Sequence, residues 1–531
     1  MVATDLHSAG HRRGVVCAPH AVAVETGHSI LAEGGNALEA MVAMAAAIAV
    51  VYPHMNHVGG DGFWLIREPS GRVRAIMAAG PASFEARPEL YREYETIPPR
   101  GPGAALTVPG AVGGWSLALD AAKANGGTLP LAVLLAPAIV QARQGYAVSR
   151  SQARLTEERL IELKYISGFA KTFLVDGKPP PVGTRLRQGA LARTLAHLAD
   201  AGLDDFYRGD VGREIAADLR RIGSPLARED LTRYHATVAE PLQVELPSGT
   251  AYNTDAPTQG VASLMILALF ARLGVTKAER FDHIHGLVEA TKRALRARDR
   301  VVTDPEHLAH PLERYLDPRF LAGERMKIGR KAARWPLTHD AGDTVWMGAA
   351  DTSGLVVSYI QSLYWEFGSG CVLPATGVLM QNRGISFSLT RGALNLLAPG
   401  RLPFHTLNPA LALLKDGRVM AYGAMGGDGQ PQTQAALFTR HVDFAEPLAE
   451  ALDRPRWVLG RTWGKPLATL RLESRFDEDL IDTLQFAGHN IDVLHEPYSD
   501  VMGHAGAAIL HPNGTCEAAH DPRADGGAAG V

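Results

Sequence analysis

Two hydroxyl-bearing residues, Thr344 and Ser362, lie in a segment whose pattern predicts a pair of strands. Residues 343–370 read DTVWMGAADTSGLVVSYIQSLYWEFGSG, with apolar runs on either side of residues 352–354. A three-residue hairpin loop needs a positive φ at its third position, and Gly354 stands there. Counting outward from this loop sets Thr344 opposite Ser362. We therefore expect the two hydroxyl groups to lie side by side across the ladder.

Thr344 has the chemistry of a nucleophile only if a base removes its proton. Threonine is a favoured strand residue, so a lone threonine is most often structural. Its own α-amino group becomes available as a base once the preceding peptide bond is cut. That amine titrates near pH 8, which leaves part of it neutral inside a cell. The arrangement suggests a hydrolase whose nucleophile becomes a chain terminus.

The glycine pair Gly426-Gly427 is a candidate for the anion-stabilising part of such a site. A tetrahedral intermediate needs preorganised N–H donors, and a glycine turn exposes backbone amides. An ordinary tight turn is the competing interpretation. The sequence contains no GxSxG, Walker A, HExxH or EF-hand motif, so other common catalytic schemes are not indicated.

The elements that must position these residues follow a mixed order. A short apolar strand, two helices and a second strand are expected between Gly14 and Pro81, followed by a mainly helical region from about 117 to 253. A further helix is expected over 281–300, and short β-rich runs dominate after 343, with helices near 434–452 and 478–488. A sandwich of sheets flanked by helices fits this order.

The predicted helix at 281–300 places His285 and Glu289 on one face, while His283 points elsewhere. These residue types can bind a metal ion. A structural His and Glu pair is the interpretation that we favour.

Bulk composition limits the partners. The chain has 531 residues, of which 46% are hydrophobic and 21% charged, with a formal net charge of -3. These values are typical of a globular enzyme and give no reason to expect nucleic acid or an acidic membrane as partner. The N-terminus lacks a secretory h-region, and the longest apolar run, residues 40–51, is too short to span a bilayer. We expect a cytoplasmic protein, whose three distant cysteines (Cys17, Cys371 and Cys516) are small core residues.

Ordered motifs along almost the entire chain resemble the γ-glutamyltransferase superfamily. They include YPHMNHVGGDGF at 52–63, TVPGAVGGW at 107–115, APTQGVASLMIL at 256–267, HGLVEATKRALRARDR at 285–300 and DPRADGG at 521–527. Members of this superfamily are N-terminal-nucleophile (Ntn) hydrolases. The resemblance implies an α+β fold, a four-layer αββα sandwich with a helical region in its N-terminal part.

The same resemblance implies roles for particular residues. Self-cleavage is expected before Thr344, which gives an α chain of residues 1–343 and a β chain of residues 344–531 held together in one intertwined fold. Ser362 takes the place of a supporting hydroxyl, and Gly426 and Gly427 supply the oxyanion hole. The partners are then a small amide substrate and the two chains of one precursor, with association into a homo-oligomer left open. No metal or organic cofactor is implied.

The residues that bind the glutamyl group in true γ-glutamyl enzymes have changed. The stretch MAAGPAS at 77–83 lacks the family's arginine, His405-Thr406 replaces a serine pair, and Ser386 stands where an aspartate binds the glutamyl amine. The segment from Phe387 to His405 is also shorter than the lid-bearing segment of the transferases, which predicts an open or differently covered pocket.

The motifs QNRGISFSL, QSLYWEFGSG and PFHTLNPAL resemble the branch that contains oxamate amidohydrolase, an enzyme of purine-nitrogen catabolism. That resemblance implies hydrolysis of oxamate to oxalate and ammonia. Arg383, on a strand expected to begin near Gln381, is the expected carboxylate-binding residue, because a planar guanidinium suits a small carboxylate. Asn382, Tyr364, His405 and Thr406 complete the expected substrate site. A structural arginine that binds backbone carbonyls is the competing interpretation of Arg383.

Two other functions remain open at this stage. One is a γ-glutamyltransferase, glutathione hydrolase or cephalosporin (glutaryl) acylase, which the changed glutamyl-binding residues disfavour. The other is a scaffold protein that keeps the fold without cleaving itself. The presence of Thr344, Ser362 and the glycine pair argues against a scaffold.

Overall fold

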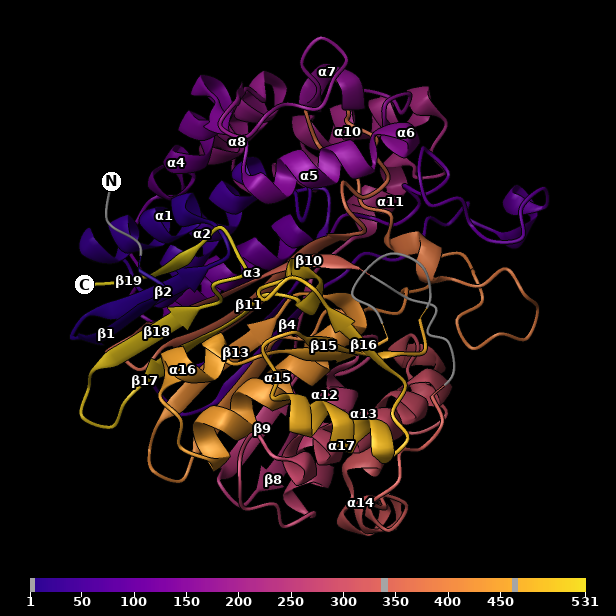
Figure 1. Ribbon diagram of the computed structural model, residues 1–531. Coiled ribbons are helices and arrows are strands. Elements are labelled where there is room, and N and C mark those ends of the chain that lie inside the picture. Colours follow the sequence, from indigo (N-terminus) through magenta and orange to yellow (C-terminus); the bar gives the residue numbers. More distant parts are fainter. Residues whose placement is uncertain (1–4, 336–341, 461–466) are drawn as a thin grey trace.

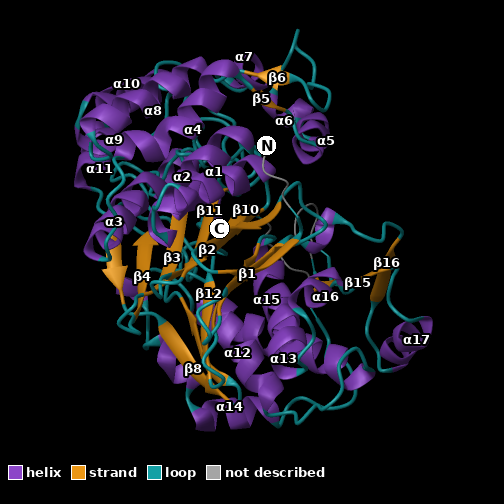
Figure 2. Ribbon diagram, turned by 90° about the vertical axis from the view of Figure 1, so that its left-hand side faces the viewer, coloured by secondary structure: helices purple, strands orange, loops and turns teal. Residues whose placement is uncertain are grey.

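The computed structural model describes residues 5–335, 342–460 and 467–531 of the chain. Two seven-stranded sheets form its centre, and helices cover the outer face of each (Figure 1). After a quarter turn, α1, α2, α4 and α8 lie above the strands, while α12, α13 and α14 lie below them (Figure 2). This is the αββα sandwich expected from the sequence, and the α+β fold class is confirmed.

The first sheet carries at its centre the hairpin that contains Thr344, the predicted nucleophile, and we call it the nucleophile hairpin. Its strands, in spatial order, are β19 (Gly527–Gly530), β2 (Gly14–Ala18), β10 (Asp343–Asp351), β11 (Val356–Tyr364), β3 (Asp61–Arg67), β4 (Val73–Ala78) and β7 (Thr237–Ala239). All of these pairings are antiparallel.

The second sheet lies below the first in Figure 1 and is also antiparallel. Its strands, in spatial order, are β1 (His7–His11), β18 (Cys516–His520), β17 (Ala505–Leu510), β13 (Val419–Ala424), β12 (Ala410–Leu414), β9 (Gly249–Asn253) and β8 (Leu242–Leu246). Two small sheets lie outside the sandwich: β14 (Trp457–Leu459), β15 (Leu470–Glu473) and β16 (Ile491–Leu494) form one, and β5 (Tyr146–Ala147) and β6 (Arg185–Leu186) the other.

The helices divide between the two outer layers. The layer over the first sheet comes from the N-terminal part: α1 (Ala21–Ala32), α2 (Ala37–Val51), α3 (Ala111–Ala124), α4 (Leu131–Gln144), α5 (Arg150–Glu158), α6 (Leu160–Leu163), α7 (Phe169–Phe173), α8 (Gly189–Ala201), α9 (Asp205–Arg208), α10 (Asp210–Ile222) and α11 (Arg228–Arg233). The helices on the side of the second sheet are α12 (Gly260–Ala271), α13 (Phe281–Val301), α14 (Pro318–Arg325), α15 (Gln430–Phe438), α16 (Leu448–Asp453) and α17 (Glu478–Phe486).

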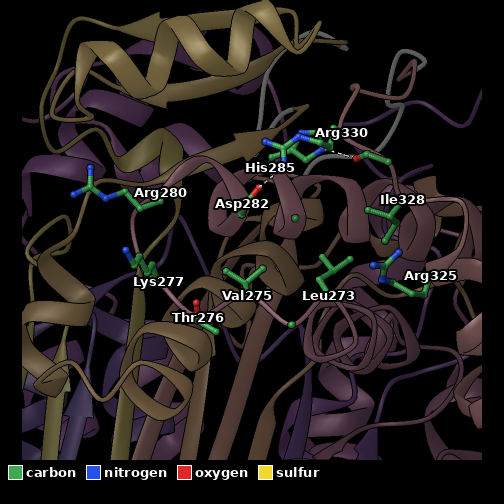
Figure 3. Close-up of a pocket in the computed structure, with 13 residues that line it drawn as sticks. Leu273, Val275, Thr276, Lys277, Arg280, Asp282, His285, Arg325, Ile328 and Arg330 are labelled. Atoms are coloured by element: carbon green, nitrogen blue, oxygen red, sulfur yellow. Dashed lines mark hydrogen bonds and ion pairs between the residues drawn. The ribbon is translucent and has the colours of Figure 1, made fainter.

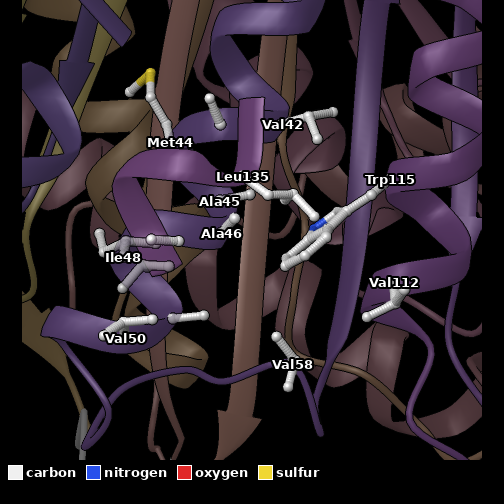
Figure 4. Close-up of a cluster of buried hydrophobic side chains, with 14 of the residues drawn as sticks. Val42, Met44, Ala45, Ala46, Ile48, Val50, Val58, Val112, Trp115 and Leu135 are labelled. Atoms are coloured by element: carbon white, nitrogen blue, oxygen red, sulfur yellow. The ribbon is translucent and has the colours of Figure 1, made fainter. Parts of the chain in front are cut away.

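Helix α2 is the centre of the upper core. All 15 of its residues are buried, as expected for a helix that is apolar on every side. Asn36 and Glu39 close a capping box at its start, which satisfies the first amides. In Figure 4, Val42, Met44 and Ile48 of this helix lie in one cluster with Trp115 of α3 and Leu135 of α4. Each buried side chain of this size contributes roughly 1.5–3 kcal/mol.

Trp346 fills the space between the two sheets. A Cβ on Gly348 of its own strand, or on Gly423 or Gly506 of the facing sheet, would lie within 2.7 Å of the indole. The indole Nε1 donates a hydrogen bond to Ser358 Oγ at 2.9 Å. The three glycines therefore make room for one large side chain that fixes the separation of the sheets.

The far end of the nucleophile hairpin is attached to α2. The Asp351 carboxylate accepts a hydrogen bond from the Ala37 amide at 2.8 Å, at the positive end of the helix. Its other oxygen accepts from the amide of Ser353 in the loop at 2.9 Å. These bonds hold the hairpin against the upper helical layer.

Two expectations about secondary structure were wrong. The end of the predicted helical region, residues 237–253, forms β7, β8 and β9, because runs such as LQVEL alternate buried apolar and exposed polar residues, which is the period of a strand. Arg383 does not lie on a strand that begins near Gln381 but opens a short 3-10 helix, η4 (Arg383–Ser386).

Among the described residues, no helix combines the length and the apolar character that a membrane span requires. Cys17, Cys371 and Cys516 are buried free thiols, as expected.

Candidate active site

Thr344 is the second residue of β10 and is almost fully buried. The predicted loop is present: Asp351 donates its amide to the Leu355 carbonyl, and Gly354 has a φ of 104°. The register then runs as predicted as far as Val345, which pairs with Gln361. Beyond that point Asp343 pairs with Tyr364, so the ladder shifts by one residue at Thr344. Thr344 thus faces both Ser362 and its neighbour Leu363, in a bulge that the sequence did not predict.

The Thr344 hydroxyl contacts the second half of the sandwich. Gln430, the first residue of α15, directs its side-chain amide at Thr344 Oγ1 at 3.4 Å. Gln430 Oε1 in turn accepts a hydrogen bond from Asn408 at 3.1 Å. This fixes the direction of the Gln430 amide, because the amide oxygen is already used.

Ser362 and Tyr364 lie on β11 opposite the bond between Asp343 and Thr344, the predicted cleavage point. The Tyr364 amide donates to Ser362 Oγ at 2.7 Å. Tyr364 has a φ of 85°, a conformation that a bulky residue rarely adopts and that is most frequent at functional sites. A Cβ on Gly342 would lie 2.8 Å from Tyr364 Cδ2, so the chain just before the predicted cleavage point lies against this ring.

Gly426 and Gly427 form the turn between β13 and α15. Their φ values are 117° and 52°, which favour glycine at both positions. Within the described part of the chain, neither backbone amide donates a hydrogen bond to a protein acceptor. Gln430, which reaches Thr344, begins α15 three residues after Gly427. The turn therefore offers two N–H donors close to the predicted nucleophile.

Helix α13 holds the glycine turn from behind. Arg298 Nη1 donates to Asp428 Oδ1 at 2.5 Å and to Gln259 Oε1 at 2.6 Å. Gln259 Nε2 then donates to the Gly427 carbonyl at 2.9 Å. Burial alone would lower the pKa of Arg298, but Asp428 and Asp299 raise it, so this arginine stays charged. A charge-assisted network thus fixes the turn.

Arg383 is almost fully buried and stacks on Tyr364. The guanidinium carbon lies 3.7 Å from the centre of the ring, within the range of a cation–π interaction. Because Tyr364 pairs with Asp343, one aromatic ring separates Arg383 from the predicted cleavage point.

Asp61, in the Gly-Gly-Asp-Gly motif of residues 59–62, lies beside Arg383. Its Oδ1 accepts from the amides of Gly80 and Gly110 and from Gln381 Nε2, at 2.9–3.2 Å. Burial raises the pKa of this carboxyl to about 7, and Arg383 opposes that rise. Asp61 is therefore poised to change charge near neutral pH.

His405 contacts Asp61 from the other side, with Nε2 3.4 Å from Asp61 Oδ2. Burial, aided by the charge of Arg383, holds the pKa of His405 well below its usual value, so the ring is neutral.

Several buried polar atoms around Arg383 have no hydrogen-bond partner among the described residues. They are Asp61 Oδ2, Gln381 Oε1, both ring nitrogens of His405 and Thr406 Oγ1. Buried polar groups are nearly always paired, so such a concentration is typical of a site that binds a polar ligand. Two of the predicted substrate residues, His405 and Thr406, belong to this group.

The Asn382 side chain bonds two backbone groups of the protein. Its side chain accepts from the Trp365 amide and donates to the Pro99 carbonyl, both at 3.0 Å. Its hydrogen-bonding groups hold the loop that carries Arg383, and substrate contact by Asn382 stays a prediction.

Asp61, Gln381 and Gln430 were not among the residues predicted from the sequence. Asp61 and Gln381 lie inside the quoted motifs VGGDGF and QNRGISFSL, and Gln430 directly follows residues 426–429. A buried acid between glycines was a usable signal for Asp61. Gln430 carried none, because only the fold brings α15 to β10.

A separate cavity of about 400 Å³ opens at the start of α13 (Figure 3). None of the candidate-site residues named above lines this cavity. It is bounded by the loop after α12, the first turn of α13 and the chain after α14, and its lining includes Lys277, Arg280, Asp282, Arg325 and Arg330. His285 lies at its edge.

A four-layer αββα sandwich with a threonine in the central hairpin is the architecture of N-terminal-nucleophile amidohydrolases, and the chain is an enzyme of this class. The chain belongs to the gamma-glutamyltranspeptidase family, whose sequence profile matches residues 23–531.

Individual relatives are similar over nearly the full length. The chain is 51% identical over 519 residues to an oxamate amidohydrolase proenzyme of Klebsiella pneumoniae, covering 97% of this chain and 98% of that one. It is 38% identical over 520 residues to a glutathione hydrolase-like proenzyme of Bacillus subtilis, with the same coverage of 97% and 98%. The crystal structure of a cephalosporin acylase from Bacillus halodurans superimposes with a TM-score of 0.91 at 30% identity, covering 100% of this chain and 98% of that one.

Proposed function

We propose that this chain is a self-processing amidohydrolase with Thr344 as nucleophile, and that it hydrolyses oxamate to oxalate and ammonia. Cleavage before Thr344 gives chains of residues 1–343 and 344–531, which stay together because β2 and β3 of the first chain pair with β10, β11 and β19 of the second in one sheet. The partners are thus the two chains of one precursor, and a homo-oligomer of this pair remains a prediction.

Maturation begins with attack of the Thr344 hydroxyl on the carbonyl carbon of Asp343. The peptide C–N bond breaks as the ester C–O bond forms, and water then hydrolyses the ester. The products are the carboxylate of Asp343 and the free α-amine of Thr344. Gln430 supports this step by directing an N–H at the attacking oxygen at 3.4 Å.

Substrate hydrolysis uses the released amine as base. The amine takes the proton of the Thr344 hydroxyl, and the oxygen attacks the amide carbonyl of oxamate. The amides of Gly426 and Gly427 stabilise the oxyanion. The amine returns the proton to the departing ammonia, and a water molecule repeats the sequence on the acyl-enzyme to release oxalate.

The observation that carries the substrate proposal is the position of Arg383 on the Tyr364 ring. In oxamate the carboxylate is bonded directly to the scissile carbonyl carbon, so its cation must lie within a few ångströms of the nucleophile. Arg383 is a buried cation next to the residues that flank Thr344, and unpaired polar atoms of His405 and Thr406 lie in the same region. A γ-glutamyl substrate would need an arginine for its α-carboxylate and an acid for its amine. Residues 77–83 contain no arginine, and Ser386 stands at the position of the acid.

The 51% identity to an oxamate amidohydrolase proenzyme supports the same substrate. The proposal includes a role in purine-nitrogen catabolism, which follows from the substrate, and a location in the cytoplasm. A second candidate, a cephalosporin acylase, is favoured by the TM-score of 0.91 to that enzyme of Bacillus halodurans.

The test compares ammonia release from oxamate with hydrolysis of γ-glutamyl-p-nitroanilide and of glutaryl-7-aminocephalosporanic acid by the same preparation. The proposal predicts a kcat/KM on oxamate at least about 100-fold above that on either larger amide, a difference of about 2.7 kcal/mol in transition-state binding. Higher kcat/KM on one of the larger amides would overturn the oxamate assignment.

A further inference from the structure

The chain that leads to the scissile bond runs along one face of α13. We call residues 329–335 the tail segment; it ends nine residues before Thr344. The side chains of the tail segment are exposed or half-buried. Trp335 is its one large apolar side chain and packs, half-buried, against the lower core, and the rest of the segment is positioned by its backbone contacts.

Four polar residues of α13 contact the backbone of the tail segment. His285 Nε2 lies 2.8 Å from the Gly329 carbonyl, and Lys292 Nζ donates to the Ala333 carbonyl at 2.7 Å. The Glu289 carboxylate accepts from the Ala333 amide, with both oxygens at 3.2 Å. Arg296 donates to the Arg334 carbonyl. These four residues, which we call the α13 clamp, share one face of the helix at spacings of 4, 3 and 4 residues.

The centre of the α13 clamp is a buried ion pair. Lys292 Nζ lies 2.7 Å from Glu289 Oε1, and the two side chains are only 3% and 2% exposed. Glu289 also accepts from the N–H of Ala333 and Lys292 donates to its carbonyl, so the pair binds the backbone of one residue on both sides. A buried pair contributes little net stability compared with apolar residues, so its presence points to a need for specific geometry.

His285, Glu289 and His489 also have the residue types and spacing of a metal site, because their ligand atoms lie within 4.8 Å of one another. Their contacts account for the cluster in another way. His285 Nδ1 and His489 Nε2 lie 2.9 Å apart and share a hydrogen bond, and Lys292 neutralises Glu289. Ala332 donates its amide to the Ala487 carbonyl just before His489, so this side of the cluster also holds the tail segment.

We infer that the α13 clamp is a binding site for the backbone of the tail segment, and that Glu289 and Lys292 act as positioning residues for cleavage before Thr344. The inference rests on the proposed self-cleavage. The same helix holds Asp428 beside the glycine turn through Arg298. Helix α13 therefore sets both the chain that enters the site and the turn that supplies the oxyanion donors.

The size of the effect on the rate of self-cleavage separates positioning from simple tethering. Even if the contact of Ala332 with Ala487 were lost together with the α13 clamp, the tail would still be held at α14, which ends at Arg325, nineteen residues before Thr344 instead of eleven for Ala333. Loop-closure entropy alone makes the longer tether roughly twofold less effective. A clamp that also aligns the scissile peptide must contribute well beyond this factor.

The experiment measures the rate at which freshly synthesised, radiolabelled precursor converts into two bands on a denaturing gel. The test variant is Glu289→Gln/Lys292→Met, which removes both buried charges and keeps their approximate volumes, so that neither partner is left unpaired. The matched control is Arg293→Gln on the same helix, which loses a 2.6 Å contact to Glu324 of α14 but no contact to the tail segment. Melting temperatures of both are measured in a Thr344→Ala background, where every chain stays whole.

The inference predicts that the double variant matures more slowly than wild type by clearly more than the twofold of a longer tether, while Arg293→Gln matures at the wild-type rate. The matured fraction of the double variant should keep the wild-type kcat/KM. In the Thr344→Ala background, the double variant should melt at the same temperature as the Arg293→Gln variant. Maturation slowed twofold or less overturns the inference. A wild type that never cleaves defeats the proposed function instead, so the two failures are distinguishable.

Discussion

The guanidinium carbon of Arg383 lies 3.7 Å from the centre of the Tyr364 ring, and the chain at Gly342 lies against the same ring. In the uncut chain, Tyr364 thus has the end of the future α chain as a neighbour. Departure of residues 342 and 343 after cleavage would uncover this ring beside the new terminus of Thr344. Substrate would then enter the place that the cleaved segment leaves.

Replacing Arg383 by alanine should lower kcat/KM on oxamate by roughly 30- to 1,000-fold, because a charge-assisted pair of hydrogen bonds to the carboxylate is worth on the order of 2–4 kcal/mol. Self-cleavage should persist, since Arg383 has no part in the attack on Asp343. The measurement is steady-state ammonia release, with two-band formation as the control. An Arg383→Ala enzyme with wild-type kcat/KM would make this arginine structural.

Replacing Gly427 by valine should lower kcat by about 100- to 1,000-fold, the usual effect of losing one oxyanion donor. The β-branched side chain is strained at a φ of 52° and would turn the amide away. Valine at Gly354, where φ is also positive but in the hairpin loop, is the matched control for backbone strain alone. A processed, folded Gly427→Val enzyme with unchanged kcat would assign the turn a purely structural role.

Asp61 should make the protein less stable as the pH rises from about 4 to about 7. Its pKa is raised to about 7 in the folded chain, so the folded state binds the proton more tightly than the unfolded state. The stabilisation is complete below pH 4 and is lost as the pH passes through 7.

The check is the difference in unfolding free energy between Thr344→Ala and Thr344→Ala/Asp61→Asn, measured by urea titration at several pH values. Across this window the unfolding free energy of the protein with Asp61 should fall by a few kcal/mol relative to that of the protein with Asp61→Asn. The groups that face position 61 are the same in both variants: Arg383, His405 and the amides of Gly80 and Gly110. A difference that is independent of pH would contradict the raised pKa.

The sequence predicted the nucleophile hairpin well because its signals are local. Gly354 allows the turn, and the alternation of side chains sets the register as far as Val345 and Gln361. It missed the shift at Thr344, since a bulge depends on what Tyr364 packs against. Tyr364 meets Gly342 and Arg383, which lie 22 and 19 residues away from it in the sequence, so only the fold brings them to its ring.

The candidate site was predictable in part for the same reason. Thr344, Ser362 and the glycine pair stand in recognisable motifs, and the structure brings Thr344 within reach of α15 through Gln430. Asp61 and Gln430 gain their surroundings only when β3 and α15 meet the hairpin. Arg383 was expected on a strand but begins a 3-10 helix, where Asn382 fixes the loop through Trp365 and Pro99.

The most direct test of the account is the intact mass of the purified wild-type protein beside that of Thr344→Ala. The account predicts two masses for the wild type, those of residues 1–343 and 344–531, with threonine as the N-terminal residue of the smaller chain. It predicts one mass and no ammonia release from oxamate for Thr344→Ala. A wild type that hydrolyses oxamate as a single uncut chain, or a Thr344→Ala variant that cuts itself at the same bond, would contradict Thr344 as the nucleophile.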